Sequence, residues 1–192
     1  MSELSVGTLS GLAANSYVID VASGSTLDLS AGAVFPAGSI IQVVSTTKTD
    51  TFSTTSTSFT DVTGLTATIT PSSASSKILV VASVGLGTGT PSATLRARLN
   101  GGNADDFVGD ASSNRARVAT YLRTTGENDW RVTMIPAHFT YLDSPASTSA
   151  TTYAVQISVD TGTGYVNRST TDGDNAAYGR GASSITLMEI AG

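Results

Sequence analysis

Apolar and polar residues alternate along much of the chain, and this pattern is typical of β-strands that bury one face. The alternation is clearest in residues 65–70, 94–99 and 153–159. In the second of these segments the leucines and the alanine fall on one side, and Arg96 and Arg98 fall on the other. No segment repeats apolar residues at the three- and four-residue spacing of a helix, so we expect no helix longer than a turn or two. The chain is therefore predicted to be all-β.

Other segments add strands to this pattern. Further strands are expected in residues 40–44, 116–123, 130–141 and 184–190, and residues 50–62 should form a strand pair or a long edge strand that ends at Thr63 and Gly64. Residues 77–84 form a continuous apolar run, which predicts a central strand buried on both faces. Strands at this short spacing indicate a sandwich or a barrel.

Glycine and proline refine the prediction. Residues 85–89 are rich in glycine, and we expect a loop there rather than a phosphate site, because Pro91 and another strand follow instead of a helix. Residues 100–102 should form a tight turn with positive φ. Pro136 should lie at a bulge or on an edge strand, because proline cannot donate to a ladder. The last strand ends two residues before the terminus, which favours a position inside a sheet.

The first 38 residues differ from the rest. They contain short apolar clusters separated by glycine, alanine and serine, too short to form a core of their own. We predict an N-terminal extended arm or small β subdomain in residues 1–38, followed by a sandwich in residues 39–192. The apolar residues of this arm that would attach to a partner are Leu9, Leu12, Tyr17, Val18, Ile19, Val21 and Phe35.

Composition narrows the possible partners. Of the 192 residues, 40% are hydrophobic but only 13% are charged, so serine and threonine fill the polar positions. The net charge of −5 argues against binding to nucleic acid. The sequence contains neither a secretion signal nor an apolar run long enough to insert into a membrane. Cysteine is absent, so stability must come from apolar burial or from oligomerisation.

The sequence offers little catalytic or metal-binding chemistry. His138 is the only histidine, and no Gly-x-Ser-x-Gly motif marks a nucleophile, so we interpret His138 as a packed or hydrogen-bonded strand residue and predict no enzyme activity. Asp172, Asp174 and Asn175 form a weak candidate for Ca²⁺, but they lack the spaced ligands and terminal glutamate of an EF-hand loop. We predict no metal and no cofactor.

Arginines gather in the middle of the chain. Arginine at alternate strand positions usually forms a solvated face. The sharper hypothesis is a subunit interface, where arginine, tyrosine and tryptophan are enriched. Its candidate residues are Arg96, Arg98, Arg123 and Trp130.

Several stretches together carry a family likeness. They are FPAGSIIQVVSTTKTD in 35–50, FTDVTGL in 59–65, and residues 69–73, 141–145, 150–153, 164–168, 178–183 and 185–190. In this order they resemble a β-sandwich domain of bacteriophage virion proteins, especially those of marine and cyanobacterial phages. The resemblance covers about residues 35 to 192. It implies an antiparallel jelly-roll-like β-sandwich, often trimeric, and it carries over no catalytic residues. Such domains occur on tail fibres, head fibres and capsid-decorating proteins.

Among these roles we predict a capsid decoration, or cement, protein that binds the outer capsid surface as a homotrimer and stabilises it. The expected partners are other copies of the chain and the major capsid protein or another virion protein, on the outer surface of a virion assembled in the host cytoplasm. The chain starts at Met1 and has an arm-like beginning without the heptads or repeats of a fibre stem. The alternative is a tail-fibre or head-fibre tip that binds a host surface receptor or glycan. A polysaccharide depolymerase ranks third.

Overall fold

The computed structural model describes residues 35–104, 107–124 and 129–192, which belong to one compact unit that runs from Phe35 to Gly192. Of the residues predicted to form an attachment arm, Phe35 lies in this unit, and the six between Leu9 and Val21 lie outside the described residues.

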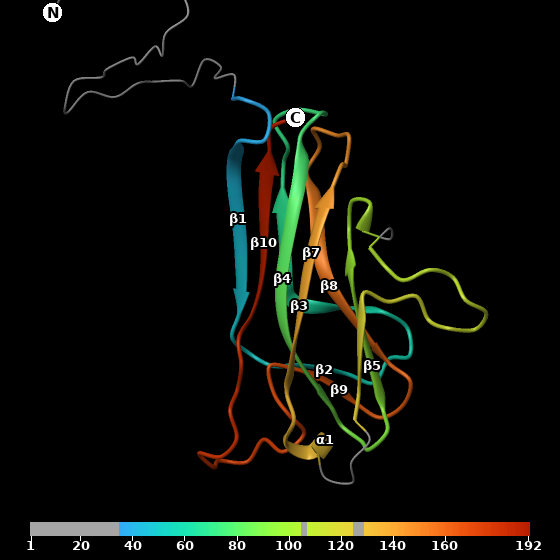
Figure 1. The fold of residues 1–192 in the computed structure, drawn as a ribbon. Coiled ribbons are helices and arrows are strands. Elements are labelled where there is room, and N and C mark those ends of the chain that lie inside the picture. The colour runs from blue at the N-terminus through green and yellow to red at the C-terminus, as the bar shows by residue number, and fades with distance from the viewer. Residues whose placement is uncertain (1–34, 105–106, 125–128) are drawn as a thin grey trace, which may run out of the picture. The chain divides into compact units, whose positions relative to one another are not determined.

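The described residues of the unit form ten strands and one helical turn. Figure 1 shows their arrangement. The strands are β1 (Ile40–Lys48), β2 (Phe52–Thr54), β3 (Thr60–Ile69), β4 (Lys77–Thr88), β5 (Thr94–Asn100), β6 (Thr120–Arg123), β7 (Ile135–Asp143), β8 (Thr151–Val159), β9 (Gly164–Val166) and β10 (Ser183–Ile190). The turn is α1 (Asp129–Val132). The all-β prediction is therefore confirmed.

The strands form two antiparallel sheets with the connectivity of a jelly roll. In the first sheet β10 pairs with β1 and with β4, and β7 pairs with the other edge of β4. The short strands β9 and β2 extend this sheet beyond the end of β10. The second sheet has the order β3-β8-β5-β6. The four long-range pairs β1–β10, β3–β8, β4–β7 and β5–β6 are those of an eight-stranded jelly roll.

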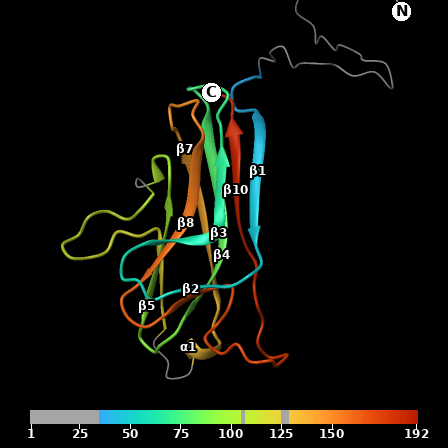
Figure 2. The ribbon, with the colours of Figure 1, turned by 180° about the vertical axis from the view of Figure 1, so that it is seen from behind.

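Two strands lie where the sequence predicted them. The last strand, β10, lies inside the first sheet between β1 and β4, with β1 at the edge (Figures 1 and 2). Pro136 lies on β7, which pairs only with β4 among the described strands, and it stands opposite Gly85. Gly85 directs its amide to Ser183 and its carbonyl to Asn167, away from β7, so the missing amide hydrogen of Pro136 costs no ladder bond.

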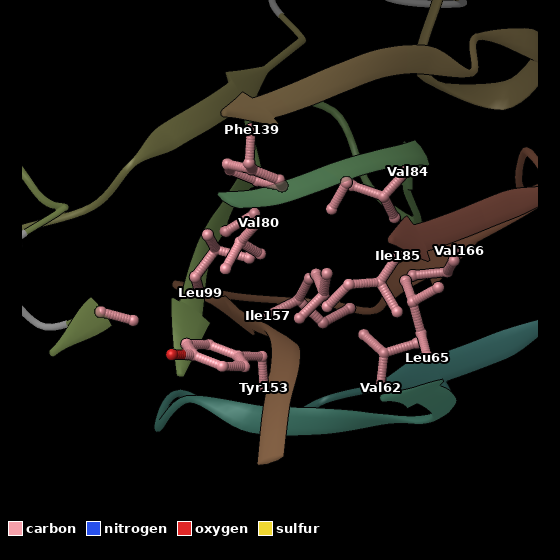
Figure 3. Packing of buried hydrophobic residues seen from close by; sticks show 14 of the residues in the cluster. Val62, Leu65, Val80, Val84, Leu99, Phe139, Tyr153, Ile157, Val166 and Ile185 are labelled. Atoms are coloured by element: carbon pink, nitrogen blue, oxygen red, sulfur yellow. The ribbon is translucent and has the colours of Figure 1, made fainter. Parts of the chain in front are cut away.

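The core lies between the two sheets. Alternate residues of each strand point into it, including Val80 and Phe139 from the first sheet and Leu99, Tyr153 and Ile157 from the second (Figure 3). These five side chains are at most 1% exposed. This is the burial that the period-two pattern of the sequence predicts.

One polar contact joins the two sheets inside this core. Tyr153 of β8 donates a hydrogen bond of 2.5 Å to the buried carboxylate of Asp143 on β7. The backbone and side-chain amides of Asn103 also donate to Asp143, at 3.1 and 2.9 Å. Burial and the hydrogen bond to Asp143 raise the pKa of Tyr153 far above its ordinary value, so this tyrosine stays a donor.

Some predicted boundaries were wrong. Residues 85–89 do not form a loop, because β4 continues to Thr88. A Cβ at Gly87 would lie 2.5 Å from the carbonyl oxygen of Arg168, so glycine here allows another backbone segment to approach a strand. Thr63 and Gly64 do not end a strand either. They lie in an irregularity of β3, where the register shifts and Gly64 has a φ of +80°.

The second half of the chain has shorter strands than predicted. The strand expected in 116–123 is only β6, and the one expected in 130–141 begins at Ile135 after the helical turn α1.

The strand predicted in 77–84 is central but is not buried on both faces. Its inward residues are buried, whereas Leu79 and Val81 on its outer face are half-buried.

Candidate functional site

The outer face of the first sheet carries a row of apolar side chains across four neighbouring strands. The register places Val43 of β1 opposite Met188 of β10, Met188 opposite Leu79 of β4, and Leu79 opposite Leu142 of β7. We call these four residues the apolar row. Strand spacing makes the row about 14 Å wide. Val43 is 55% exposed and Leu142 is 49% exposed.

The apolar row continues toward one end of the sheet. Ile40 lies opposite Ile190, and Ile40 is 56% exposed. Lys77 lies opposite Ile190 on the far side, and among the residues of these four strands it is the only Lys, Arg, Asp or Glu on this face. Contiguous apolar side chains on an exposed sheet face, bordered by polar residues, are a feature of interaction sites.

The other half of the same face is polar but nearly uncharged. Two further rows cross it: Ser45, Thr186, Val81 and Thr140, then Thr47, Ser184, Ser83 and His138. Ser45 and Thr186 share a hydrogen bond of 2.8 Å between their hydroxyls. His138 lies on a strand, as the sequence predicted, but its side chain is exposed on the outer face, so the interpretation of a packed residue was wrong.

A buried glutamate fixes β1 against β10 at the apolar end. The carboxylate of Glu189 accepts hydrogen bonds from the side-chain amide of Gln42 at 2.6 Å and from the amide and hydroxyl of Ser72 at 2.7 and 2.6 Å. Burial alone would raise the pKa of Glu189, but the bonds from Ser72 and Gln42 outweigh it, and the pKa lies below its usual value. The apolar row therefore lies partly on two strands, β1 and β10, whose register these hydrogen bonds help to hold.

The backbone before β1 is joined to the same end. The amide of Gly38 donates to the carbonyl of Ala191, and the amide of Ala191 donates to the carbonyl of Ser39, each at 2.8 Å. Residues 38 and 39 are thus part of the sandwich.

The second sheet presents a different outer face. Arg96 and Arg98 of β5 point outward, as the alternation predicted, while Leu95 and Leu99 are buried. Arg123 of β6 also points outward. Arg98 donates to Gln156 at 2.9 Å, and its guanidinium lies 4.3 Å from the centre of the Phe59 ring. The fold brings Arg96 and Arg123 onto adjacent strands. Trp130, the fourth predicted interface residue, belongs to α1, and its side chain lies outside the described part of the structure.

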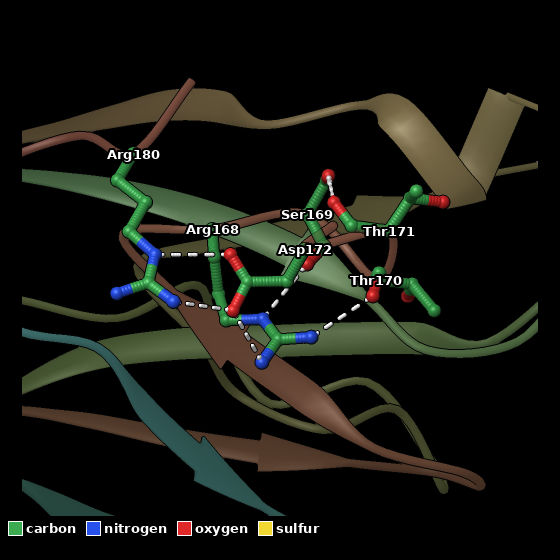
Figure 4. Close-up of polar contacts among 6 residues, drawn as sticks. All are labelled: Arg168, Ser169, Thr170, Thr171, Asp172 and Arg180. Atoms are coloured by element: carbon green, nitrogen blue, oxygen red, sulfur yellow. Dashed lines mark hydrogen bonds and ion pairs between the residues drawn. The ribbon is translucent and has the colours of Figure 1, made fainter. Parts of the chain in front are cut away.

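In the candidate calcium site, the carboxylate of Asp172 is bound by arginine side chains. The guanidinium of Arg180 donates to both carboxylate oxygens of Asp172, at 3.0 and 2.7 Å, and Arg168 lies 3.0 Å from the second oxygen (Figure 4). The Arg180 hydrogen bond, with the charge of Arg168, lowers the pKa of Asp172. Asn175 uses its side-chain oxygen to accept a bond from the amide of Ala177 at 2.9 Å. Asp172 and Asn175 thus have protein partners at the oxygens that a cation would need.

The described ranges hold neither a cluster of metal-ligand side chains nor a membrane-spanning helix. No three His, Cys, Asp or Glu side chains among the residues with assigned positions come together as metal ligands would. In the same residues no helix is both long and apolar enough to span a bilayer.

Sequence reasoning missed the apolar row as a site. Val43 and Leu142 are far apart in the chain, and only the register of four strands brings them together. One signal was present, because the continuous apolar run in 77–84 predicted a strand covered on both faces. In the unit described here only the inward face of that strand is fully buried.

Comparison with known proteins gives little further identification. The chain matches no protein-family model and no curated protein sequence. A structure of the Gx strain of infectious bursal disease virus has a TM-score of 0.40 and 14% identity, covering 78% of this chain and 37% of its own. The VP2 subviral particle of the same virus has a TM-score of 0.32 and 13% identity, covering 78% and 38%. The chain thus spans less than two fifths of the length of these viral proteins.

Proposed function

We propose that the protein is a structural component of a virus particle: a capsid decoration protein that binds the outer capsid surface as a homotrimer and stabilises it. Two independent observations support this. The sequence from residue 35 onward resembles domains of phage virion proteins, many of which are trimeric. The fold leaves an apolar row open on one sheet.

The apolar row is the observation that carries the proposal. Fully burying a side chain the size of valine, leucine or methionine contributes about 1.5–3 kcal/mol relative to leaving it exposed. A neighbour that covers Val43 and Leu142 would gain most from this, since about half of each is exposed. The face is nearly free of charge, as the centre of a protein interface usually is, so little charge would lose its hydration. We assign the apolar row to contact between copies of the chain.

The proposal separates assembly from attachment. The sandwich makes the trimer, and the residues before Phe35, with Leu9, Leu12, Tyr17, Val18, Ile19 and Val21, attach it to the capsid. Three arms on one trimer bind a symmetric surface with an avidity far above that of one arm. The proposal places the protein on the outer surface of a virion assembled in the host cytoplasm, and it assigns no catalytic step.

The test compares two double variants of the full chain on the same two strands. Val43→Asp with Leu142→Asp puts charges into the apolar row, and Thr47→Asp with Thr140→Asp puts them into the polar half of the same face. Light scattering at micromolar concentration should give three times the chain mass of 19.4 kDa for the wild type and the control, and one chain mass for the apolar-row variant.

Capsid binding gives the second readout. The apolar-row variant should cosediment with undecorated capsids more weakly than the control, because single arms lose avidity. A chain lacking residues 1–34 should stay trimeric and fail to cosediment. A monomeric wild type, or a trimeric apolar-row variant, would refute the assigned interface.

A further inference from the structure

A pocket of about 640 Å³ lies on the outer face of the second sheet, over β5 and β6. The residues that give it its chemistry are Arg96, Arg115, Arg123, Tyr121, Thr94 and Asn114. The β5–β6 register sets Arg96 opposite Tyr121 and Thr94 opposite Arg123. Arg115 and Asn114 come from the segment between these strands, which projects from the sandwich (Figure 1). The pocket thus joins two strands and a loop.

The pocket concentrates positive charge on an acidic protein. Three of the ten basic residues line it, although the net charge of the chain is −5. Within the described ranges, the guanidinium groups of Arg96, Arg115 and Arg123 form no ion pair with a carboxylate. The charge of Arg96 acts electrostatically on the carboxylate of Asp160. That carboxylate accepts a hydrogen bond from the backbone amide of Thr94 at 2.7 Å. Gathered like charges of this kind attract an anion and hold it in a concave site.

The other side chains narrow the class of anion. Arginine binds planar carboxylates through paired hydrogen bonds. Tyr121 is 65% exposed, so its ring offers a flat apolar surface beside the arginines. Thr94 and Asn114 add a hydroxyl and an amide, which can pair with sugar hydroxyls. The volume lies in the usual range of pockets for small ligands.

We infer that this pocket binds a carboxylated sugar of a polysaccharide, with the carboxylate between Arg96 and Arg123 and the sugar ring against Tyr121. Arg115 adds charge from the loop side. The inference does not rest on the proposed function, because the pocket and the apolar row lie on opposite sheets.

The test is a calorimetric titration of the full chain with trigalacturonic acid, and with maltotriose as the uncharged sugar. The acid should bind and maltotriose should not, and added salt should weaken the binding. Arg96→Gln and Arg123→Gln should each lower the affinity about tenfold or more. Arg117→Gln is the matched control, because Arg117 is close in sequence to Arg115 but donates to the carbonyl of Gly109 at 2.8 Å. It should leave the affinity unchanged.

Tyr121→Ala separates a sugar site from a plain anion site. We expect the arginines alone to bind sulfate weakly. The substitution should lower the affinity for trigalacturonic acid several-fold and leave the affinity for sulfate unchanged. Circular dichroism checks that each variant is folded. Failure of the acid to bind at millimolar concentration, or an equal affinity in the Arg96→Gln and wild-type proteins, would overturn the inference. Tighter binding of hexaglutamate than of trigalacturonic acid would assign the pocket to an acidic peptide instead.

Discussion

The two outer faces of the sandwich are opposites in chemistry, although both belong to strands that bury their inner side in the same core. The face of the first sheet carries the apolar row and a serine and threonine half, with Lys77 as its one Lys, Arg, Asp or Glu among the four described strands. The face of the second sheet carries Arg96, Arg98 and Arg123. The fold constrains the inner positions of both sheets in the same way. Outer positions do not have to pack in the core, so their residue types indicate the kind of surroundings that each face contacts.

The largest expected change is in the free energy of unfolding, and it should differ between an inward and an outward residue of the same strand. Leu187 and Met188 are neighbours on β10, but Leu187 is fully buried and Met188 belongs to the apolar row. In the Val43→Asp, Leu142→Asp background, which we expect to stay monomeric, Leu187→Ala should lower the free energy of unfolding by about 2–5 kcal/mol. Met188→Ala should lower it by less than about 1 kcal/mol. Urea denaturation measures both, and equal losses would mean that the apolar row is already covered within one chain.

A smaller loss of stability is expected from Glu189→Gln. The carboxylate accepts charge-assisted hydrogen bonds from Gln42 and Ser72, so Glu189→Gln should cost on the order of 1–3 kcal/mol at neutral pH. The pKa of Glu189 is lowered in the folded protein, so its contribution is present above the ordinary pKa of 4.5 and is lost as the pH falls through the lower folded value. The stability difference between variant and wild type should therefore shrink below about pH 4.5.

Hydrogen exchange should show which strands the Glu189→Gln substitution destabilises. Amides of β1 in the Glu189→Gln variant should exchange faster, because Glu189 and Gln42 link β10 to β1. Amides of β5 and β6 should keep their wild-type rates. Equal acceleration in both sheets would mean that the two faces are not independently stabilised.

The smallest effect is expected from calcium. Neither outer face uses the Asp172 loop, and the carboxylate of Asp172 already binds Arg168 and Arg180. Millimolar CaCl₂ and millimolar EDTA should therefore give the same melting temperature in differential scanning calorimetry. A rise of several degrees with calcium would show that the cation displaces the arginines.

Much of the fold could be predicted from local pattern. The alternation in β5 identified its buried residues Leu95, Ala97 and Leu99, and the turn after it has positive φ at Gly101 and Gly102. What failed depended on contacts distant in sequence. The glycines of residues 85–89 suggested a loop, but Gly87 is a strand residue that another backbone segment approaches.

The candidate sites were less predictable than the fold for the same reason. The sequence named Arg96 and Arg123 but not Tyr121, which lies opposite Arg96 only through the β5–β6 register. It named no member of the apolar row. A period-two pattern tells which side of a strand faces the core, but it does not tell which strands are neighbours.

The position of β10 between β1 and β4 has a consequence for the timing of synthesis. Of the described strands only β10 pairs with β1, and the paired residues are 135 to 150 positions apart, from Lys48 with Ser183 to Ile40 with Ile190. The backbone hydrogen bonds of β1 therefore form only after β10 has been made. Such distant pairing makes folding slow relative to proteins with local contacts. The apolar row needs Met188 between Val43 and Leu79, so a ribosome-bound or truncated chain that lacks β10 cannot display it. Assembly through the apolar row, as we propose it, is therefore restricted to chains in which β10 has joined the sheet.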